Sequence, residues 1–468
     1  MSQRTIGFLL VPLYARVLSP TEYGQIALLI TITAALGTVL GLGLETAVFR
    51  SYVRLRDQPV ELARFINTVG AFAVVVPLVA AVVAAVGLSP LIEGWFSVPR
   101  SGVALGFVGA ALAISATAVP LALLRAQERL RDYVRLSLVQ VLLTVGMTFV
   151  FVVILHWGVT GWMLALACSA GILLLRGLAV LGHRWSRDLD TRYLAAALAF
   201  GLPMVPHALA HWGLSLSDRA ILAAFLDPAQ VGVYYVAYQF GLPVSVITIA
   251  LTQAAQPLYA EASFASDRYP ELARTASNQV VITGFLTMVV ALLGPPAVLA
   301  FLPGSYAQAA PLIPWIALGS GLFGLYFVPM NAITVLSGRN RWVWIVTVTA
   351  ALTNVGLNLL LVPRIGATGA AINTAIGYAI LLVGVSGYMY LVLERPVRFE
   401  WSRIVLGLII VVAATAAASA IGPGDPVLKL VTRGATILLV AIVLAAAMQF
   451  GLPSPRAGRS WRLPLSRR

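Results

Sequence analysis

The chain alternates between long apolar stretches and short polar connections that are rich in arginine. Most of the apolar stretches reach about 20 residues, the length that an α-helix needs to cross roughly 30 Å of hydrocarbon. Membrane-spanning strands would instead alternate over about ten residues, and no such pattern dominates. The pattern predicts an all-α polytopic membrane protein with about 14 spans, at residues 4–18, 24–49, 64–92, 101–124, 136–157, 159–181, 201–226, 229–259, 278–303, 308–336, 341–362, 366–393, 403–421 and 427–450.

Composition agrees with this class. Hydrophobic residues make up 60% of the chain and charged residues 10%, whereas soluble domains carry about 25% charged residues. The single cysteine, Cys168, excludes a disulfide framework and any cysteine-based metal site. We expect no metal site, no cofactor and no catalytic residue.

The net charge of +14 is distributed as a topology signal. With the N-terminus inside, 25 basic residues lie in cytoplasmic connections or in the tail, against six on the outer side. Basic residues are retained on the cytoplasmic side of membrane proteins. We therefore expect a multi-pass protein of the cytoplasmic membrane with both termini in the cytoplasm. A nucleic-acid partner is not expected, because the arginines form no single patch.

Two short strings recur at a fixed separation of 208 residues. The string from Leu18 to Gly24 (LSPTEYG) returns from Leu226 to Gly232 (LDPAQVG), and Gly158–Gly161 (GVTG) returns as Gly366–Gly369 (GATG). Six predicted spans separate the equivalent turns. An even number gives both units the same topology, so the chain is predicted to be a parallel repeat of two six-helix units, as in many transporters.

The residues of these turns also carry a family resemblance. The chain resembles oligosaccharide flippases of the polysaccharide-biosynthesis type, within the multidrug/oligosaccharidyl-lipid/polysaccharide exporter superfamily. The matching positions are Pro12, Arg16, Leu18–Pro20, Tyr23, Gly24, Gly41–Gly43 and Arg50 in the first half, and Gly201–Pro203, Asp218, Arg219, Val231–Tyr234, Gln256, Pro257 and Gly366–Ala371 in the second.

The resemblance implies a MATE-like fold, in which two six-helix lobes face each other across a central cavity. It also implies movement of a polyprenyl-diphosphate-linked oligosaccharide across the membrane by rocking of the lobes, for cell-surface polysaccharide biosynthesis. Membrane lipids, a polysaccharide polymerase and glycosyltransferases are the expected partners.

The predicted organisation has four parts. Residues 1–182 form an N-terminal lobe, 183–394 a C-terminal lobe, 395–451 two additional helices and 452–468 a basic cytoplasmic tail. The first apolar run, residues 6–18, spans only about 20 Å as a helix. We interpret it as the outer half of a truncated first span, and the alternative is an unusually short helix.

The sharpest candidate site is a polar stripe in the seventh span. His207, His211, Ser215 and Arg219 recur at intervals of four, which places them along one helical face. Polar groups at membrane depth are costly and usually face a cavity or a partner. One interpretation is a polar wall that contacts the sugar or the diphosphate, and the other is hydrogen bonding between packed helices.

Arg219 has a planar fork of donors that suits a phosphate. The alternative is a local ion pair with Asp218, its neighbour in the sequence, or snorkelling to the outer interface. Arg16, near the outer end of the first span, faces the same choice. Its repeat equivalent is Ala224, so the two units differ there.

Further candidates lie in the second and eighth spans. Glu45 is interpreted either as a site for a coupling proton or ion, or as the partner of an arginine on a neighbouring helix. Arg50 is either a topology signal or a receptor for the diphosphate at the cavity mouth. Thr252, Gln253 and Gln256 offer neutral hydrogen-bonding groups for glycan hydroxyls, or for contacts between helices.

Two other functions compete with flipping. A membrane glycosyltransferase or polymerase needs convergent carboxylates or a sizeable outer loop, whereas the predicted outer acids are isolated. A multidrug cation antiporter needs deep acids, whereas the polar groups of these spans are mainly Arg, His and amides. The sequence therefore favours a transporter of an anionic cargo.

Overall fold

The structure, a computed structural model, describes residues 10–181, 189–264, 266–337, 339, 341–393, 397–419 and 424–449. Within these residues the chain forms helices and short connections, and no strand. The predicted all-α class is confirmed. The basic tail and the first six residues of the predicted first span lie outside the described part.

The first half of the chain begins with a short helix. Its elements are α2 (Val11–Val17), α3 (Pro20–Gly41), α4 (Leu44–Leu55), α5 (Pro59–Phe96), α6 (Arg100–Ala116), η1 (Thr117–Leu121), α7 (Ala122–Ala126), α8 (Leu130–Thr148), η2 (Phe149–Ile154) and α9 (Gly158–Leu181).

The second half begins with α10, another short helix. Its elements are α10 (Thr191–Gly201), α11 (Met204–Phe225), α12 (Pro228–Ala254), α13 (Gln256–Phe264), η3 (Ser266–Arg268), α14 (Tyr269–Phe301), η4 (Gly304–Leu312), α15 (Ile313–Asn331), η5 (Ala332–Ser337), α16 (Val343–Val392), α17 (Trp401–Ser419) and α18 (Pro426–Gln449).

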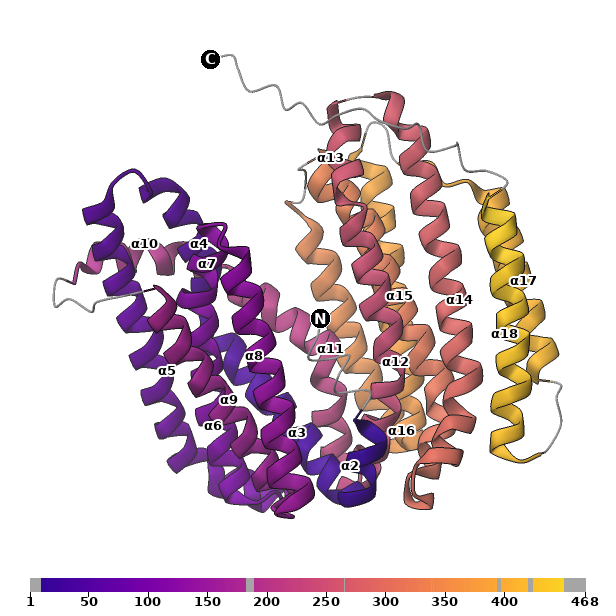
Figure 1. The fold of residues 1–468 in the computed structure, drawn as a ribbon, viewed down its shortest axis with the longest axis horizontal. Helices are drawn as coiled ribbons and strands as arrows, with labels where there is room; N and C mark the ends of the chain where they lie inside the picture. The colour runs from indigo at the N-terminus through magenta and orange to yellow at the C-terminus, as the bar shows by residue number, and fades with distance from the viewer. Residues whose placement is uncertain are drawn as a thin grey trace.

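The helices pack into two lobes (Figure 1). In the N-terminal lobe α6 packs against α5 and α9, and α10 packs against α4 and α5; in the C-terminal lobe α16 packs against α11 and α15, with α17 and α18 against α14. The lobes meet where α3 contacts α11 and α12. Figure 1 shows them converging near α2 and diverging toward α4 and α10 on one side and α13 on the other. The boundary predicted after residue 182 stays a prediction.

The described part contains 11 helices long and apolar enough to cross a membrane, or 12 if α10 and α11, bent by 42° at their junction, form one span. The predicted number of 14 therefore stays a prediction. Helix α16 leaves the helical conformation at Ile365 and Gly366. This break coincides with the one predicted between spans 341–362 and 366–393.

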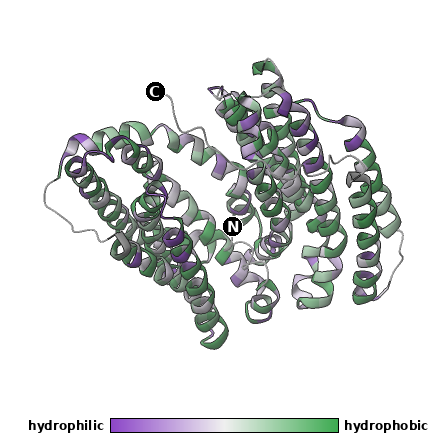
Figure 2. Ribbon diagram, turned by 45° about the horizontal axis from the view of Figure 1, so that its top comes forward, coloured by the Kyte–Doolittle hydropathy of each residue, from purple (hydrophilic) through white to green (hydrophobic). Residues whose placement is uncertain are grey.

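Large hydrophobic side chains are exposed on the outer helices. Val83 and Val86 of α5 are 66% and 69% exposed, and Ile409 of α17 and Leu439 of α18 are about as open. Figure 2 shows apolar residues along most helices, with hydrophilic segments mainly near the helix ends. An apolar face of this extent is unfavourable in water and suits contact with lipid chains.

Two local features differ from the predicted spans. The span predicted at 24–49 is interrupted at Leu42 and Gly43, which both adopt left-handed backbone angles. A second difference is α10, which was not predicted as a helix. The interruption and the end of α10 are in close contact. A Cβ atom built on Gly43 would lie 2.6 Å from the carbonyl oxygen of Gly201, the last residue of α10. Only glycines allow the backbones to approach this far.

The repeated turns begin equivalent helices. Ser19 caps α3 by accepting a hydrogen bond from the Glu22 backbone N–H, and the Glu22 side chain accepts from the Ser19 N–H in return. This reciprocal arrangement satisfies two donors that a helix start otherwise leaves open. Pro20 and Pro228 each occupy the first turn, where a missing N–H costs nothing. The repeated strings from Leu18 to Gly24 and from Leu226 to Gly232 thus mark the starts of α3 and α12.

Candidate substrate cavity

A cavity of about 650 Å³ lies between the two lobes. Its walls come from α2, α3, α8 and α9 on one side and from α11, α12, α15 and α16 on the other. This volume is typical of sites for small organic ligands. Because both lobes contribute, any change in their relative orientation changes the shape of the cavity.

The polar stripe of the seventh span lies on α11. His211, Ser215 and Arg219 all line the cavity, as their spacing of four residues requires of one helical face. The imidazole of His211 also lies beside the ring of Phe323, with 5.9 Å between centroids. The side chain of His207 lies outside the described residues.

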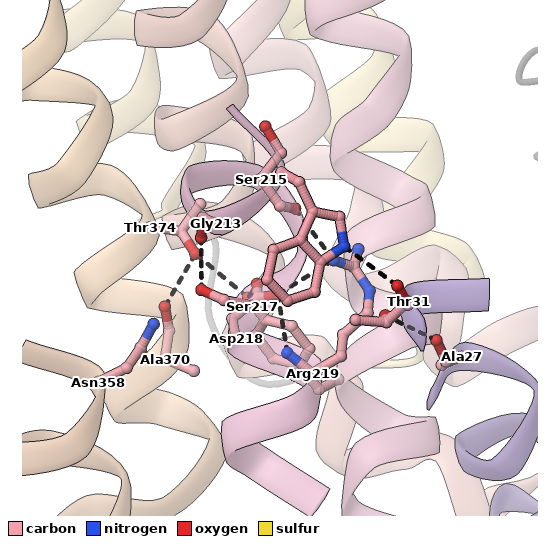
Figure 3. Close-up of polar contacts among 12 residues, drawn as sticks. Ala27, Thr31, Gly213, Ser215, Ser217, Asp218, Arg219, Asn358, Ala370 and Thr374 are labelled. Atoms are coloured by element: carbon pink, nitrogen blue, oxygen red, sulfur yellow. Dashed lines mark hydrogen bonds and ion pairs between the residues drawn. The ribbon is translucent and has the colours of Figure 1, made fainter. Parts of the chain in front are cut away.

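Arg219 and Asp218 form a buried ion pair. Their side chains are 3% and 7% exposed, and Arg219 Nη1 lies 3.0 Å from Asp218 Oδ1. The same Nη1 donates to the Ser215 carbonyl oxygen at 3.1 Å, and Asp218 Oδ1 also accepts from the Arg219 backbone N–H at 2.8 Å (Figure 3). The ion pair that one interpretation predicted is therefore present, on a residue that also lines the cavity.

The guanidinium group of Arg219 has further capacity to bind. Its carbon lies 4.2 Å from the ring centroid of Tyr238 and 5.7 Å from that of Tyr235, within the range of cation–π attraction. Its Nε is buried without a hydrogen-bond partner. A buried donor without an acceptor is costly. An anionic ligand in the cavity would supply the missing acceptor.

Asp218 is connected to α12 and α16. Its Oδ2 accepts a hydrogen bond from the Tyr234 hydroxyl, whose oxygen lies 3.1 Å from Thr374 Oγ1. Thr374 in turn donates to the Ala370 carbonyl oxygen at 2.9 Å (Figure 3). Tyr234 is fully buried. The carboxylate is thus held by donors from two helices and does not depend on Arg219 alone.

Aromatic rings from both lobes line the rest of the cavity. Tyr14 and Trp162 come from the N-terminal lobe and pack edge to face at 5.0 Å, while Trp212, Tyr238 and Phe323 come from the C-terminal lobe. Trp212 Nε1 donates to the Thr31 carbonyl oxygen of α3 at 3.0 Å. This hydrogen bond joins the two lobes and fixes the orientation of the indole.

Two of the predicted site residues lie in interhelical contacts of the N-terminal lobe. Glu45 of α4 pairs with Arg125 of α7, as its second interpretation predicted. The guanidinium of Arg50 lies over the ring of Phe200, 4.6 Å from the centroid. Neither Glu45 nor Arg50 lines the cavity described above.

The remaining predicted residues also lie outside its lining. Arg16 is exposed on α2. Thr252 is buried and donates to the Thr248 carbonyl oxygen at 2.8 Å, whereas Gln253 and Gln256 are exposed. Gln256 Nε2 lies 3.5 Å from Asn331 Oδ1. Their roles in the substrate pathway stay predictions.

Sequence reasoning missed Trp212, Tyr234, Tyr238 and Thr374. Tyr234 and Tyr238 are four residues apart in an apolar span, a spacing that places both hydroxyls on one helical face. That pattern was available in the sequence. The contribution of Thr374 from α16 had no sequence signal. Among the described residues, no group of three His, Cys, Asp or Glu side chains is arranged to hold a metal ion.

Comparison with known families gives one match. Residues 13–311, more than half of the chain, match the family of polysaccharide biosynthesis proteins. No curated protein sequence matches the chain.

Several solved structures share the fold. Lipid II flippase MurJ in an inward closed conformation has a TM-score of 0.77 at 11% identity, over 96% of this chain and 98% of the MurJ chain. An inward-facing multidrug resistance MATE family transporter of the MOP superfamily has a TM-score of 0.62 at 16% identity, over 89% and 96%. A MATE protein in the straight conformation has a TM-score of 0.56 at 16% identity, over 84% and 92%. The predicted MATE-like fold is confirmed.

Proposed function

The chain belongs to the polysaccharide biosynthesis protein family, and we propose that it is a flippase for a polyprenyl-diphosphate-linked oligosaccharide. The cargo's head group moves from the cytoplasmic to the outer leaflet of the cytoplasmic membrane by alternating access, without covalent chemistry. The polymerase and the glycosyltransferases of the same polysaccharide are the proposed partners.

The observation that carries this proposal is the position of Arg219 in the cavity wall. Among the described residues that line the cavity, Arg219 is the one whose side chain carries a permanent charge. A guanidinium group with an unpartnered Nε suits the phosphate of a lipid-linked sugar. Arginine also remains charged when buried, so the guanidinium group keeps its charge beside Asp218 throughout a transport cycle.

The aromatic lining supports a sugar next to that phosphate. The rings of Trp212 and Phe323 offer flat apolar surfaces, and the hydroxyls of Tyr238 and Ser215 offer hydrogen bonds. Ligand sites typically combine apolar walls with a few placed polar groups. A diphosphate at Arg219 would leave the glycan beside these walls.

The two-lobe arrangement supports alternating access. The lobes converge near α2 and diverge at the end that carries α4, α10 and α13 (Figure 1). The arginine distribution supports a cytoplasmic location for this diverging end. Outward movement of a diphosphate also proceeds down an inside-negative potential, which contributes about 2.3 kcal/mol per charge per 100 mV.

A multidrug cation antiporter is the second candidate, because MATE transporters share the fold. Such a protein needs a carboxylate that receives the cation. The buried carboxylate beside this cavity, Asp218, is not among the residues that line it, whereas Arg219 is. That difference favours the anionic cargo.

Reconstitution tests the proposal directly. Purified protein is placed in liposomes with a fluorescent polyprenyl-diphosphate glycan in the inner leaflet, and exposure of the glycan on the outer leaflet is followed by enzymatic or chemical quenching. We expect exposure to rise above that of protein-free liposomes. Absence of this rise, together with efficient exchange of a drug cation for protons, would establish the antiporter.

A further inference from the structure

We propose that the junction of α14 and α17 is a binding site for the headgroup of an anionic phospholipid. Arginines from these two helices share a single carboxylate at the junction, and an exposed tryptophan lies beside them. The site is separate from the cavity, and its ligand is a membrane lipid that is held in place, not the transported cargo.

One carboxylate serves two guanidinium groups at this junction. Arg403 Nε lies 2.8 Å from Glu400 Oε2, and Arg274 Nε lies 3.6 Å from Glu400 Oε1. The nearest acid on α14, Glu271, is one turn before Arg274 and pairs with Arg268 instead. The two arginines therefore share one negative charge, which leaves an excess of positive charge for an anion.

The two guanidinium groups also keep donors for a ligand. Arg274 Nε is buried without a hydrogen-bond partner, and neither Nη atom of Arg274 donates to a residue that the structure describes. Arg403 donates from Nη1 to Asn278 Oδ1 at 3.2 Å, which holds its guanidinium group beside α14. Because the two groups reach the two oxygens of one carboxylate, both lie within reach of one phosphate. Arginine donors form strong, charge-assisted hydrogen bonds with phosphate oxygens.

The junction is open to a ligand of this kind. The side chains of Arg274 and Arg403 are 31% and 20% exposed, and that of Glu400 is 32% exposed. Arg398, two residues before Glu400, is exposed and forms no ion pair within the described part of the chain. A third arginine thus lies close in sequence to the shared carboxylate.

The neighbouring side chains suit the boundary between headgroups and hydrocarbon. Trp401, the first residue of α17, is 64% exposed, and its ring lies 5.9 Å from that of Phe399 between centroids. Tryptophan is enriched at the level of the headgroups. The next turns of α17 expose Val405, Leu406 and Ile409, which suit contact with acyl chains. A lipid beside α17 would have its headgroup at the arginines and its chains along the helix.

Such a lipid would hold α17 against α14. Figure 1 shows α17 and α18 at the edge of the C-terminal lobe, beside α14. The start of α17 is already attached to α14, because the Glu400 backbone N–H donates to Ser277 Oγ at 2.8 Å. A phosphate that bridges Arg274 and Arg403 adds a contact between the same two helices. A ligand that binds only the folded state stabilises it.

The test uses full-length protein in a neutral detergent and dioctanoyl phosphatidylglycerol, with the dissociation constant of the first bound lipid measured by native mass spectrometry. We expect Arg274→Gln and Arg403→Gln each to raise it about fivefold, which corresponds to the ~1 kcal/mol that one basic residue contributes beside an anionic membrane. Arg192→Gln is the matched control. It removes the same charge from an ion pair, with Asp190 on α10, and should leave binding unchanged.

Glu400→Gln supplies the opposite change. It removes the negative charge that the two arginines share and keeps the shape of the side chain, so we expect the dissociation constant of phosphatidylglycerol to fall. Dioctanoyl phosphatidylcholine, whose headgroup has no net charge, should bind all these variants equally. If the ion pairs only fasten α17 to α14, Glu400→Gln lowers thermal stability and binds phosphatidylglycerol no more tightly.

Each outcome bears on the site alone, because no variant changes a residue that lines the cavity. Weaker binding of phosphatidylglycerol by both arginine variants, with tighter binding by Glu400→Gln, supports the lipid site. Unchanged binding by Arg274→Gln overturns it. If the arginine variants do not fold, unchanged or weaker binding by Glu400→Gln overturns it. Equally tight binding of glycerol phosphate, which has no acyl chains, would overturn the lipid as the ligand and assign the site to a soluble phosphate.

Discussion

Gly24 and Gly232, which are equivalent positions of the repeat, pack against each other's helices. A Cβ atom built on Gly24 would lie 1.8 Å from the Pro228 carbonyl oxygen, and one built on Gly232 would lie 1.9 Å from the Pro20 carbonyl oxygen. The contact is reciprocal, as a twofold axis between α3 and α12 requires. It lies at the converging end of the lobes, where a rocking motion would have its pivot.

Substitution of either glycine by alanine should separate α3 from α12. The added methyl group meets backbone, which has no rotamer with which to move away, so we expect Gly24→Ala to lower the free energy of unfolding by about 1–3 kcal/mol. Thermal unfolding in detergent measures this loss. Gly87→Ala on α5 is the control, because nothing lies within 4 Å of its added methyl group. Equal stability of both variants would contradict a tight pivot.

Charge reversal at Arg219 should abolish flipping. Arg219→Glu places a second carboxylate beside Asp218 and repels a phosphate. Arg219→Lys keeps the charge but loses the planar fork, so we expect it to retain partial activity. Initial rates of flipping in liposomes, normalised to the amount of inserted protein, measure both. If Arg219→Glu reduces insertion and flipping equally, Arg219 has only a structural role.

Substitution of Trp212 should affect binding of the sugar and leave binding of the diphosphate unchanged. Trp212→Leu removes the ring, so we expect weaker binding of a glycan-bearing probe by up to about tenfold, or about 1.4 kcal/mol. Binding of geranyl diphosphate without a sugar should not change. Trp212→Phe keeps a ring but loses the hydrogen bond to Thr31, and it should bind sugar better than the leucine variant. Equal effects on both probes would contradict a sugar-binding role.

Glu45 should not be required to couple flipping to the movement of a proton or sodium ion. Its ion pair with Arg125 is half exposed, and such pairs contribute about 0–1 kcal/mol. We expect Glu45→Gln to reduce stability slightly and to leave the dependence of flipping on pH and sodium unchanged. Flipping assays across pH, with and without sodium, measure this. A lost or shifted dependence would favour the alternative interpretation, in which Glu45 binds the coupling ion.

Much of the architecture was predictable from local pattern. Apolar runs long enough to span a membrane predicted an all-α chain, because hydrocarbon leaves no other partner for backbone polar groups than the helix itself. The fixed interval between Gly24 and Gly232 predicted a duplicated unit. The spacing of His211, Ser215 and Arg219 predicted a shared face, since helix geometry alone determines it.

Other local features were less predictable. The interruption of the second span at Leu42 and Gly43 arises from close contact with Gly201, about 160 residues later in the chain. Helix α10 packs against α4 and α5, and short amphipathic helices give a weak hydropathy signal. Both depend on neighbours that hydropathy does not identify.

Local pattern was enough to predict a helical chain, two related halves and a polar face on α11 that carries an arginine. Which polar residues meet depends on how the helices pack. This packing directs Asp218 toward both Arg219 and Tyr234, brings Thr374 from a helix more than 150 residues away, and pairs Glu45 with Arg125 outside the cavity lining. Spacing along one helix fixes a face, whereas the partner of a buried charge is fixed by how separate helices pack.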